Sequence, residues 1–285
     1  MEEIAGVLRL IRPINCTMMG FAVVIGAAIG GGLWFLGSWP SLALGFLTGF
    51  TLTGGAMAIN DYYDREIDTI NEPGRPIPSG AVTPQEALAI SITLSAVGLL
   101  TAWRTNLICL ALAVFSWLIM FLYSAAGKRT GLLGNLLVST CIAIPFVYGG
   151  VTVENRVSVL TLLFALIAFL SNTGREVTKG IADVEGDMSL GIRTIAVSRG
   201  SIMAGRVSAV FYLSAAILSL LPLVLGLVSS LYIPFIAFTD LGIVHSSYSL
   251  VQNTGRENSR RIKNRILVWM VSGLVGFLVG GFLKV

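Results

Sequence analysis

Charged side chains are scarce in this sequence. Only 12% of its 285 residues are Asp, Glu, Lys or Arg, whereas 55% are hydrophobic, and soluble domains usually carry about 25% charged residues. The hydrophobic residues are gathered in blocks of about 20, the length that a helix needs to cross a bilayer. This composition excludes a soluble protein with a large core and predicts a protein that is folded in a membrane.

Cysteine and histidine are also rare. The three cysteines, Cys16, Cys109 and Cys141, lie in or beside apolar segments without the spacing of a metal site, so we interpret them as small buried hydrophobic residues. The single histidine, His245, lies in an apolar segment, where packing or a hydrogen bond explains it better than catalysis. Asp240 in the same segment is a functional candidate, because an ionisable group at mid-span is costly. The sequence assigns neither residue a role.

The excess of basic over acidic residues is small and gives a net charge of +4. In a soluble protein such an excess would hint at nucleic acid, but membrane proteins retain Lys and Arg on their cytoplasmic loops. We therefore predict the lipid bilayer, and no nucleic acid, as a partner. The sequence sets no oligomeric state.

Nine apolar segments are long enough to span a bilayer, and no alternation typical of strands competes with them. They cover residues 14–37, 41–60, 84–103, 105–125, 131–152, 157–174, 202–224, 228–250 and 263–284. The sequence therefore predicts an all-α fold, in which residues 1–285 form a single domain with about nine transmembrane helices. Glycines inside these segments are predicted contact points between helices.

The basic residues predict the topology of these nine spans. Sixteen of the 19 basic residues fall on the side that holds the N-terminus. Because Lys and Arg favour the cytoplasmic side, we place the N-terminus in the cytoplasm. The acidic residues follow the same split, with Glu154 alone on the opposite side, so the charged loops 61–83 and 175–201 both face the cytoplasm. Long charged connections of this kind are usually functional.

The first of these loops begins with an acidic motif. Asn60, Asp64 and Asp68 follow one another at intervals of four residues, so a helix stacks them on one face. The second loop holds Asp183 and Asp187 at the same interval. Like charges at this spacing repel one another, and a bound cation would offset the repulsion.

The ligand types predict which cation this is. Carboxylates and an amide, with no Cys or His nearby, suit a hard ion such as Mg²⁺, which commonly bridges one or two carboxylates to phosphate oxygens. Two carboxylate pairs that face each other would hold magnesium and one diphosphate. The alternative is an acidic loop that only aids solubility, which explains one such motif more easily than two.

Basic residues are interleaved with both motifs and are natural partners for phosphate oxygens. Arg75 lies in a loop that three prolines stiffen. Arg175 and Lys179 precede the second acidic motif, and Lys128 follows Tyr123 at the end of the fourth span. Retention of positive charge on the cytoplasmic side remains the alternative explanation, and we favour a functional one for Arg75 and Lys128.

At these residues the sequence resembles the UbiA superfamily of intramembrane prenyltransferases. Asn60-Asp61-x-x-Asp64-x-x-x-Asp68 resembles the first Asp-rich motif of that family, Asp183-x-x-x-Asp187 the second, and Tyr123 to Lys128 its Tyr/Lys element. The resemblance extends along the whole chain. It implies a helical bundle around a central cavity, Mg²⁺, and a polyprenyl diphosphate donor whose tail points into the membrane.

The resemblance also implies roles for single residues. Asp64, Asp68, Asp183 and Asp187 are the expected catalytic residues and, together with Asn60, the expected metal ligands. The residues expected to bind substrate are Asn60, Arg75, Tyr123, Lys128, Lys179 and Asn15.

The acceptor is predicted from shorter stretches. Arg12-Pro13-Ile14-Asn15-Cys16, the loop around Arg75, and the segment from Arg175 to Asp187 most resemble the branch of the family that makes archaeal lipids. That resemblance implies transfer of a geranylgeranyl group from geranylgeranyl diphosphate to geranylgeranylglyceryl phosphate.

Several alternatives stay open. The loop around Arg75 also resembles chlorophyll synthases, so an aromatic acceptor such as 4-hydroxybenzoate, or a tetrapyrrole, is possible. A transporter or a membrane scaffold is the alternative outside the enzyme class. The candidates for binding the acceptor's phosphate are Arg12, Lys179 and Arg129.

Overall fold

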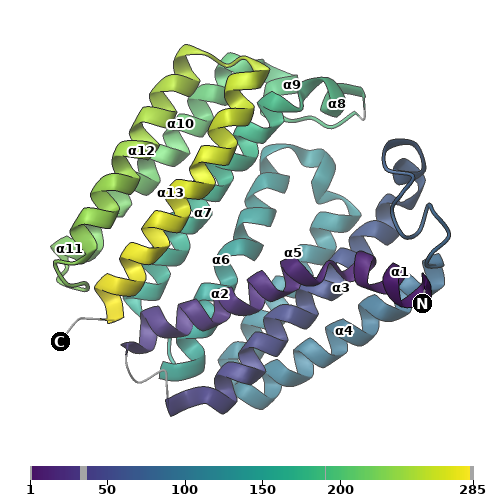
Figure 1. Ribbon diagram of the computed structural model, residues 1–285, viewed down its shortest axis with the longest axis horizontal. Coiled ribbons are helices and arrows are strands. Elements are labelled where there is room, and N and C mark those ends of the chain that lie inside the picture. The colour runs from purple at the N-terminus through teal and green to yellow at the C-terminus, as the bar shows by residue number, and fades with distance from the viewer. Residues whose placement is uncertain (1, 33–36, 190, 283–285) are drawn as a thin grey trace. The chain divides into compact units, whose positions relative to one another are not determined.

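The computed structural model describes residues 2–32, 37–189 and 191–282 (Figure 1). Every regular element in these ranges is a helix, as the apolar blocks predict. The helices are α1 (Glu2–Ile11), α2 (Pro13–Gly31), α3 (Trp39–Asn71), α4 (Pro84–Thr105), α5 (Leu107–Ala125), a short 3-10 helix (Gly127–Thr130), α6 (Leu132–Glu154), α7 (Val159–Ala182), α8 (Val184–Ser189), α9 (Ile195–Arg199), α10 (Ser201–Leu218), α11 (Leu221–Val224), α12 (Tyr232–Gln252) and α13 (Arg256–Phe282).

Each of the nine predicted spans contains a helix, and positions 33–36 and 283–284 of the first and last spans lie outside the described residues. Eight helical segments of the described chain are long and apolar enough to cross a membrane. The helix of the remaining predicted span, α12, has 21 residues. Polar side chains, Asp240 and His245 among them, make it less hydrophobic than the other eight. The chain is therefore a multi-pass membrane protein, and nine spans is an approximate count.

The chain divides into two units. Unit 1 contains residues 1–27, 34–125 and 144–156, and unit 2 contains residues 28–33, 126–143 and 157–285. The division crosses α6 at Ile144, next to Pro145 inside that helix. Proline removes one backbone hydrogen bond from a helix.

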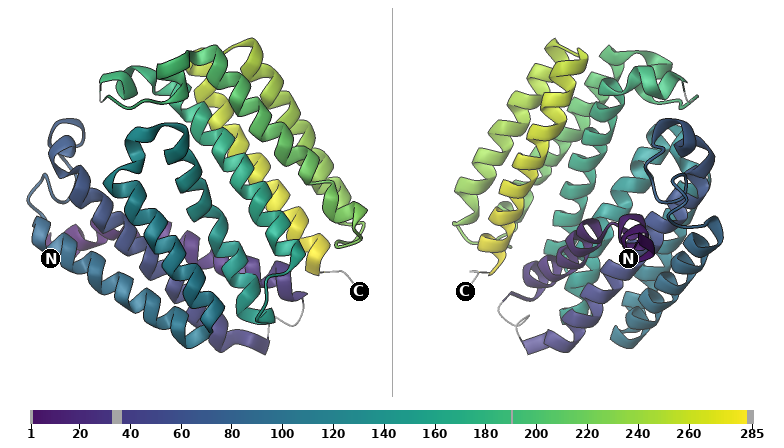
Figure 2. Two further views of the ribbon diagram at one scale, coloured as in Figure 1. Left: turned by 180° about the vertical axis from the view of Figure 1, so that it is seen from behind. Right: turned by 45° about the vertical axis from the view of Figure 1, so that its right-hand side comes forward.

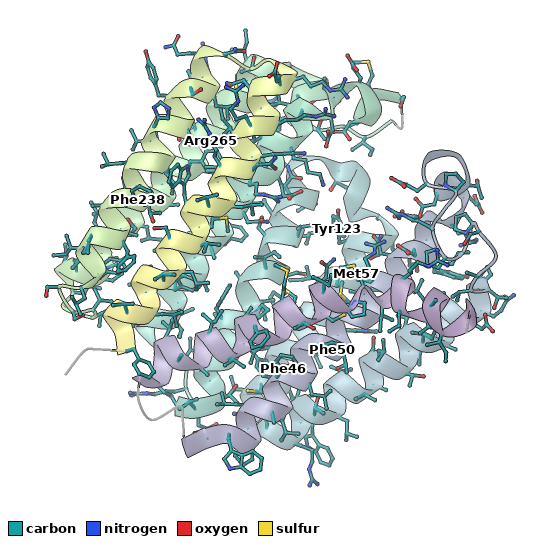
Figure 3. All side chains as sticks on the ribbon, in the orientation of Figure 1. Phe46, Phe50, Met57, Tyr123, Phe238 and Arg265 are labelled. Atoms are coloured by element: carbon teal, nitrogen blue, oxygen red, sulfur yellow. The ribbon has the colours of Figure 1, made fainter. Side chains whose placement is uncertain are left out.

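In unit 1, α3 is the central helix and packs against α1, α4 and α5. Figure 3 labels Phe46, Phe50 and Met57 along it. Close contact between helices depends on glycine: a methyl group on Gly149 of α6 would lie 1.9 Å from the carbonyl oxygen of Val23 in α2. Small residues allow this approach where the bilayer supplies no hydrophobic drive for helices to associate.

In unit 2, α7, α10, α12 and α13 form a four-helix bundle (Figure 2). Its core contains Tyr212, Ile243, Leu250 and Ile266, all buried. A polar seam joins α7 to α10, in which the Thr178 hydroxyl lies 2.9 Å from the Tyr212 hydroxyl. Interhelical hydrogen bonds of this kind hold membrane helices together where apolar contacts discriminate weakly.

Candidate active site

The first acidic motif lies on the last turns of α3, and our placement of it in a loop was wrong. With 33 residues, α3 is about 50 Å long at about 1.5 Å per residue, whereas the hydrocarbon core of a bilayer is about 30 Å thick. Its acidic end therefore extends beyond the core as a continuous helix. The predicted stacking is confirmed, because Asn60 Nδ2 donates a hydrogen bond of 3.1 Å to Asp64 Oδ2.

Arg75 is centred on this motif. Its Nη1 lies 2.7 Å from Asp68 Oδ2, 3.5 Å from Asp61 Oδ1 and 4.0 Å from Asp64 Oδ2. The loop that presents Arg75 is anchored by Val82, which is buried with Leu10 of α1. The structure thus brings Arg75 to the predicted carboxylates, and its guanidinium is the counter-ion of the cluster.

A second arginine reaches the same cluster from the junction of α1 and α2. Arg12 Nη2 lies 2.6 Å from Asp61 Oδ1. The backbone of Arg12 has a φ of 52°, in the left-handed region that residues other than glycine rarely adopt. Strained backbone of this kind persists where the surrounding structure enforces it, and it gathers at functional sites.

The carboxylates of this cluster are buried to different degrees. Asp61 and Asp68 are buried, and Asp64 is half-buried. Burial raises the pKa of Asp68 above its ordinary value, and the Arg75 guanidinium opposes that rise by favouring the charged form. The guanidinium of Arg75 therefore favours the charged form of Asp68, which is the form that binds a cation.

The second acidic motif spans a break between two helices of unit 2. Asp183 caps the end of α7, and Asp187 lies in α8. The backbone N–H of Asp187 donates to the carbonyl of Asp183 at 2.9 Å, so the helical interval of four residues continues across the break. Burial and the neighbouring Asp183 carboxylate raise the pKa of Asp187, and Lys179 opposes this rise. A divalent cation would relieve that repulsion.

Two cations at the end of α7, Arg175 and Lys179, are held by Glu176, for which the sequence predicted no role. Its Oε1 accepts from Arg175 Nη1 at 3.0 Å, and its Oε2 lies 3.7 Å from Lys179 Nζ. All three residues lie on the last turns of α7. The interval of three residues between Glu176 and Lys179 is the signal that could have found this pair.

The remaining predicted residues are Tyr123, Asn15 and Lys128, together with Arg129 as a candidate for the acceptor phosphate. Tyr123 is half-buried in the last turn of α5, in unit 1, and Asn15 is exposed near the start of α2. The side chains of Lys128 and Arg129 lie outside the described residues. Their backbone belongs to the 3-10 helix of unit 2.

The donor chemistry of both motifs fits magnesium. Asn60, Asp64 and Asp68 supply hard oxygen ligands in unit 1, and Asp183 and Asp187 supply two carboxylates in unit 2. Within the described parts of the chain, no group of three or more Asp, Glu, His and Cys side chains is arranged to hold a metal ion. That the two motifs act on one diphosphate stays a prediction.

The comparisons with known proteins agree with the motifs. The model of the UbiA prenyltransferase family matches residues 19–279. A digeranylgeranylglyceryl phosphate synthase from Methanopyrus kandleri is 36% identical over 271 residues, which cover 95% of this chain and 97% of the relative. The enzyme of that name from Methanosarcina mazei is 36% identical over 284 residues, with 96% and 97% covered.

Solved structures show the same fold. A structure of digeranylgeranylglyceryl phosphate synthase is similar with a TM-score of 0.90, at 29% identity and with 99% of each chain covered. A UbiA homologue from Archaeoglobus fulgidus, bound to GPP and Mg²⁺, has a TM-score of 0.68 at 18% identity, with 95% of this chain and 99% of that chain covered. The protein described here therefore belongs to the UbiA prenyltransferase family, as a multi-pass membrane enzyme.

Proposed function

We propose that this enzyme transfers a geranylgeranyl group from geranylgeranyl diphosphate to the glycerol hydroxyl of geranylgeranylglyceryl phosphate, with Mg²⁺ as cofactor, in archaeal ether-lipid biosynthesis. The observation that carries the proposal is the presence of two Asp motifs on one chain, each with carboxylates at an interval of one helical turn and with cations beside them. The named synthases from two archaea support the choice of acceptor.

The metal ligands in this proposal are Asp64, Asp68, Asp183 and Asp187. Asn60 donates to Asp64 through its amide nitrogen, which leaves its amide oxygen as a further ligand. Magnesium held by these groups supplies positive charge where negative charge develops on the departing diphosphate. Arg75, Lys128, Tyr123 and Asn15 bind the diphosphate beside it.

The reaction breaks the bond between C1 of the prenyl chain and the diphosphate oxygen, and it forms a bond between C1 and the acceptor hydroxyl oxygen. The hydroxyl proton leaves to a carboxylate of the motifs or to the diphosphate. The apolar helices exclude water, which would otherwise capture the allylic cation.

The phosphate of the acceptor needs a cationic partner. Lys179 is 51% exposed and Arg175 is partly buried on the same helix, and both are held by Glu176. We place the acceptor phosphate with Lys179. Arg12 and Arg129 are the other candidates.

The membrane orientation is part of the proposal. In the topology predicted from the sequence, sixteen basic residues share a side with both Asp motifs, so we place the N-terminus and both motifs in the cytoplasm. Labelling of cysteines introduced at Gly74 and Asn155 by a membrane-impermeant reagent tests this placement, because only the first should be reached from the cytoplasmic side.

An acceptor competition tests the function. The purified protein in lipid nanodiscs is given labelled geranylgeranyl diphosphate together with geranylgeranylglyceryl phosphate, 4-hydroxybenzoate and chlorophyllide in parallel reactions. Label should enter the lipid acceptor alone, and EDTA should stop the reaction until Mg²⁺ is restored. Incorporation only into an aromatic or tetrapyrrole product would overturn the acceptor, and full turnover in EDTA would overturn the role of the metal.

A further inference from the structure

Asp61 is the most buried carboxylate of the first acidic motif. Its side chain is 1% exposed, and no described residue donates a hydrogen bond to its Oδ2. Its other oxygen, Oδ1, faces two guanidinium groups, Arg12 at 2.6 Å and Arg75 at 3.5 Å. One oxygen of Asp61 is therefore buried and the other is faced by both guanidinium groups, whereas the Asp64 side chain is more exposed and its Oδ2 lies 4.0 Å from Arg75.

The two arginines come from distant segments and share one oxygen atom. Arg12 is 49 residues before Asp61 in the sequence, and Arg75 is 14 residues after it. Two guanidinium groups this close repel one another. The carboxylate between them removes that repulsion and fixes both side chains in one place.

Arg12 retains capacity to bind an anion. Its second contact is from Nη1 to the sulfur of Met57, at 3.3 Å, and a thioether is a weak acceptor, whereas a guanidinium has five N–H donors. The side chain is 33% exposed. Figure 3 labels Met57 on α3, beside the start of α2. The Arg12 guanidinium is thus held in place by Asp61, while its Nη1 donates only to the weakly accepting sulfur of Met57 among the described residues.

We propose that Asp61 is a positioning residue, which holds Arg12 and Arg75 as one paired site for the phosphate oxygens of a substrate and does not bind the metal. This inference rests on the proposed function. The phosphate oxygens belong to the prenyl diphosphate or to the phosphate of the lipid acceptor, and Arg12 and Arg75 contact them directly while Asp61 acts through the arginines.

The test compares Asp61→Asn with Glu66→Gln, a matched loss of charge on the same helix. Glu66 is exposed, and its described partner is Arg65. Initial rates are measured while the donor, the acceptor and Mg²⁺ are varied in turn. Asp61→Asn should raise the KM for one of the two substrates by roughly 10- to 100-fold, because a displaced guanidinium loses a charge-assisted hydrogen bond to the phosphate. The Mg²⁺ requirement should not change, and Glu66→Gln should behave as the unmodified enzyme.

The substrate whose KM rises identifies the source of the phosphate. A higher Mg²⁺ requirement in Asp61→Asn, or a fall in kcat with both KM values unchanged, would overturn the positioning role. Failure of the unmodified enzyme to transfer a prenyl group would instead overturn the proposed function, so the two failures are distinguishable.

A double-mutant comparison separates positioning from a general effect on folding. If Asp61 acts through Arg12, Asp61→Asn should have a much smaller effect on KM in an Arg12→Gln background than in the unmodified enzyme. Fully additive effects would contradict the proposal. Should Asp61→Asn fail to fold, Arg12→Gln alone must still raise the KM for one of the two substrates, and unchanged KM values for both substrates in that variant would overturn the proposal.

Discussion

The two acidic regions of this enzyme are assembled in different ways. In unit 1 the carboxylates at the end of α3 are mostly buried and are paired with arginines from two other segments, Arg12 and Arg75. In unit 2 the charged groups of α7 and α8 lie within thirteen consecutive residues, 175–187, and Glu176 holds the nearby cations. The carboxylates of the first motif are thus fixed by tertiary ion pairs, whereas those of the second depend on local helix geometry, with one exposed tertiary pair nearby between Glu185 and Arg256 at 3.2 Å.

This difference indicates a division of roles. A buried cluster that already contains two guanidinium groups is organised before substrate arrives, which favours electrostatic stabilisation without reorganisation. Asp183 and Asp187 are half-buried on either side of a helix break, and no arginine of the described residues forms an ion pair with them. We expect a metal ion to organise the second region more than the first.

The largest expected effect tests whether both regions are needed. Asp64→Asn and Asp183→Asn should each lower kcat by about 1,000-fold, the scale of a lost group that stabilises charge in the transition state. Labelled geranylgeranyl transfer in nanodiscs measures this, with size-exclusion profiles to check folding. Full activity in either variant would show that the acidic region with the substitution has no catalytic role.

The next largest effects compare the loss of Arg75 in unit 1 with the loss of Lys179 in unit 2. Arg75→Gln removes a guanidinium with three carboxylate neighbours, so it should lower kcat/KM by about 100-fold and also lower thermal stability, because a buried carboxylate loses its partner. Lys179→Gln removes an exposed ammonium and should lower kcat/KM by about tenfold without loss of stability. Equal loss of stability in the two variants would contradict the contrast drawn here.

Sequence patterns predicted the parts of this fold that depend on local information. Apolar blocks located the helices, and the interval from Asn60 to Asp68 located one face of α3. The ends of helices were predicted less well: α7 continues to Ala182, beyond the predicted residue 174, because backbone hydrogen bonds continue where the apolar residues stop. The helix α1 was missed, since its 10 residues are too few to span a bilayer.

The ion pairs of the candidate site were beyond the reach of sequence patterns. Arg12 and Asp61 are 49 residues apart, and no periodic pattern relates them. From sequence patterns, Arg12 is therefore only one of three candidates for the acceptor phosphate, and Asp61 has no role of its own. Tertiary packing of α1 and the loop after α3 decides these contacts, and it depends on buried apolar residues such as Leu10 and Val82.

A third prediction concerns the thermal stability of glycine variants in the two units. In unit 1, Gly149→Ala would place a methyl group 1.9 Å from the Val23 carbonyl, which is backbone. In unit 2, Gly242→Ala would meet the ring of Trp269 at 2.4 Å, a side chain that can move. We expect Gly149→Ala to lower the melting temperature in detergent more than Gly242→Ala, because overpacking costs about 1–3 kcal/mol or more where neighbours cannot yield.

Gly37→Ala is the control for both variants, since no atom of the described residues lies within 4 Å of the added methyl group. It should melt at the temperature of the unmodified protein. A Gly242→Ala variant that is less stable than Gly149→Ala would show that the bundle of unit 2 is the more tightly packed of the two.

The smallest expected effect concerns a second buried carboxylate. Like Asp61, Asp240 has one buried oxygen without a described partner, in this case Oδ1. The other oxygen of Asp240 accepts a hydrogen bond of 2.7 Å from the Ser219 hydroxyl, whereas the other oxygen of Asp61 faces two arginines. The Ser219 hydroxyl also lies 2.6 Å from the carbonyl of Ala216, so it retains an acceptor when Asp240 is replaced. Asp240→Asn should therefore keep transfer within about twofold and stability within about 1 kcal/mol. Measuring Asp240→Asn in parallel with Asp61→Asn tests whether a carboxylate is essential because it is buried or because it holds two arginines. An equally large loss of transfer in the two variants would favour burial alone.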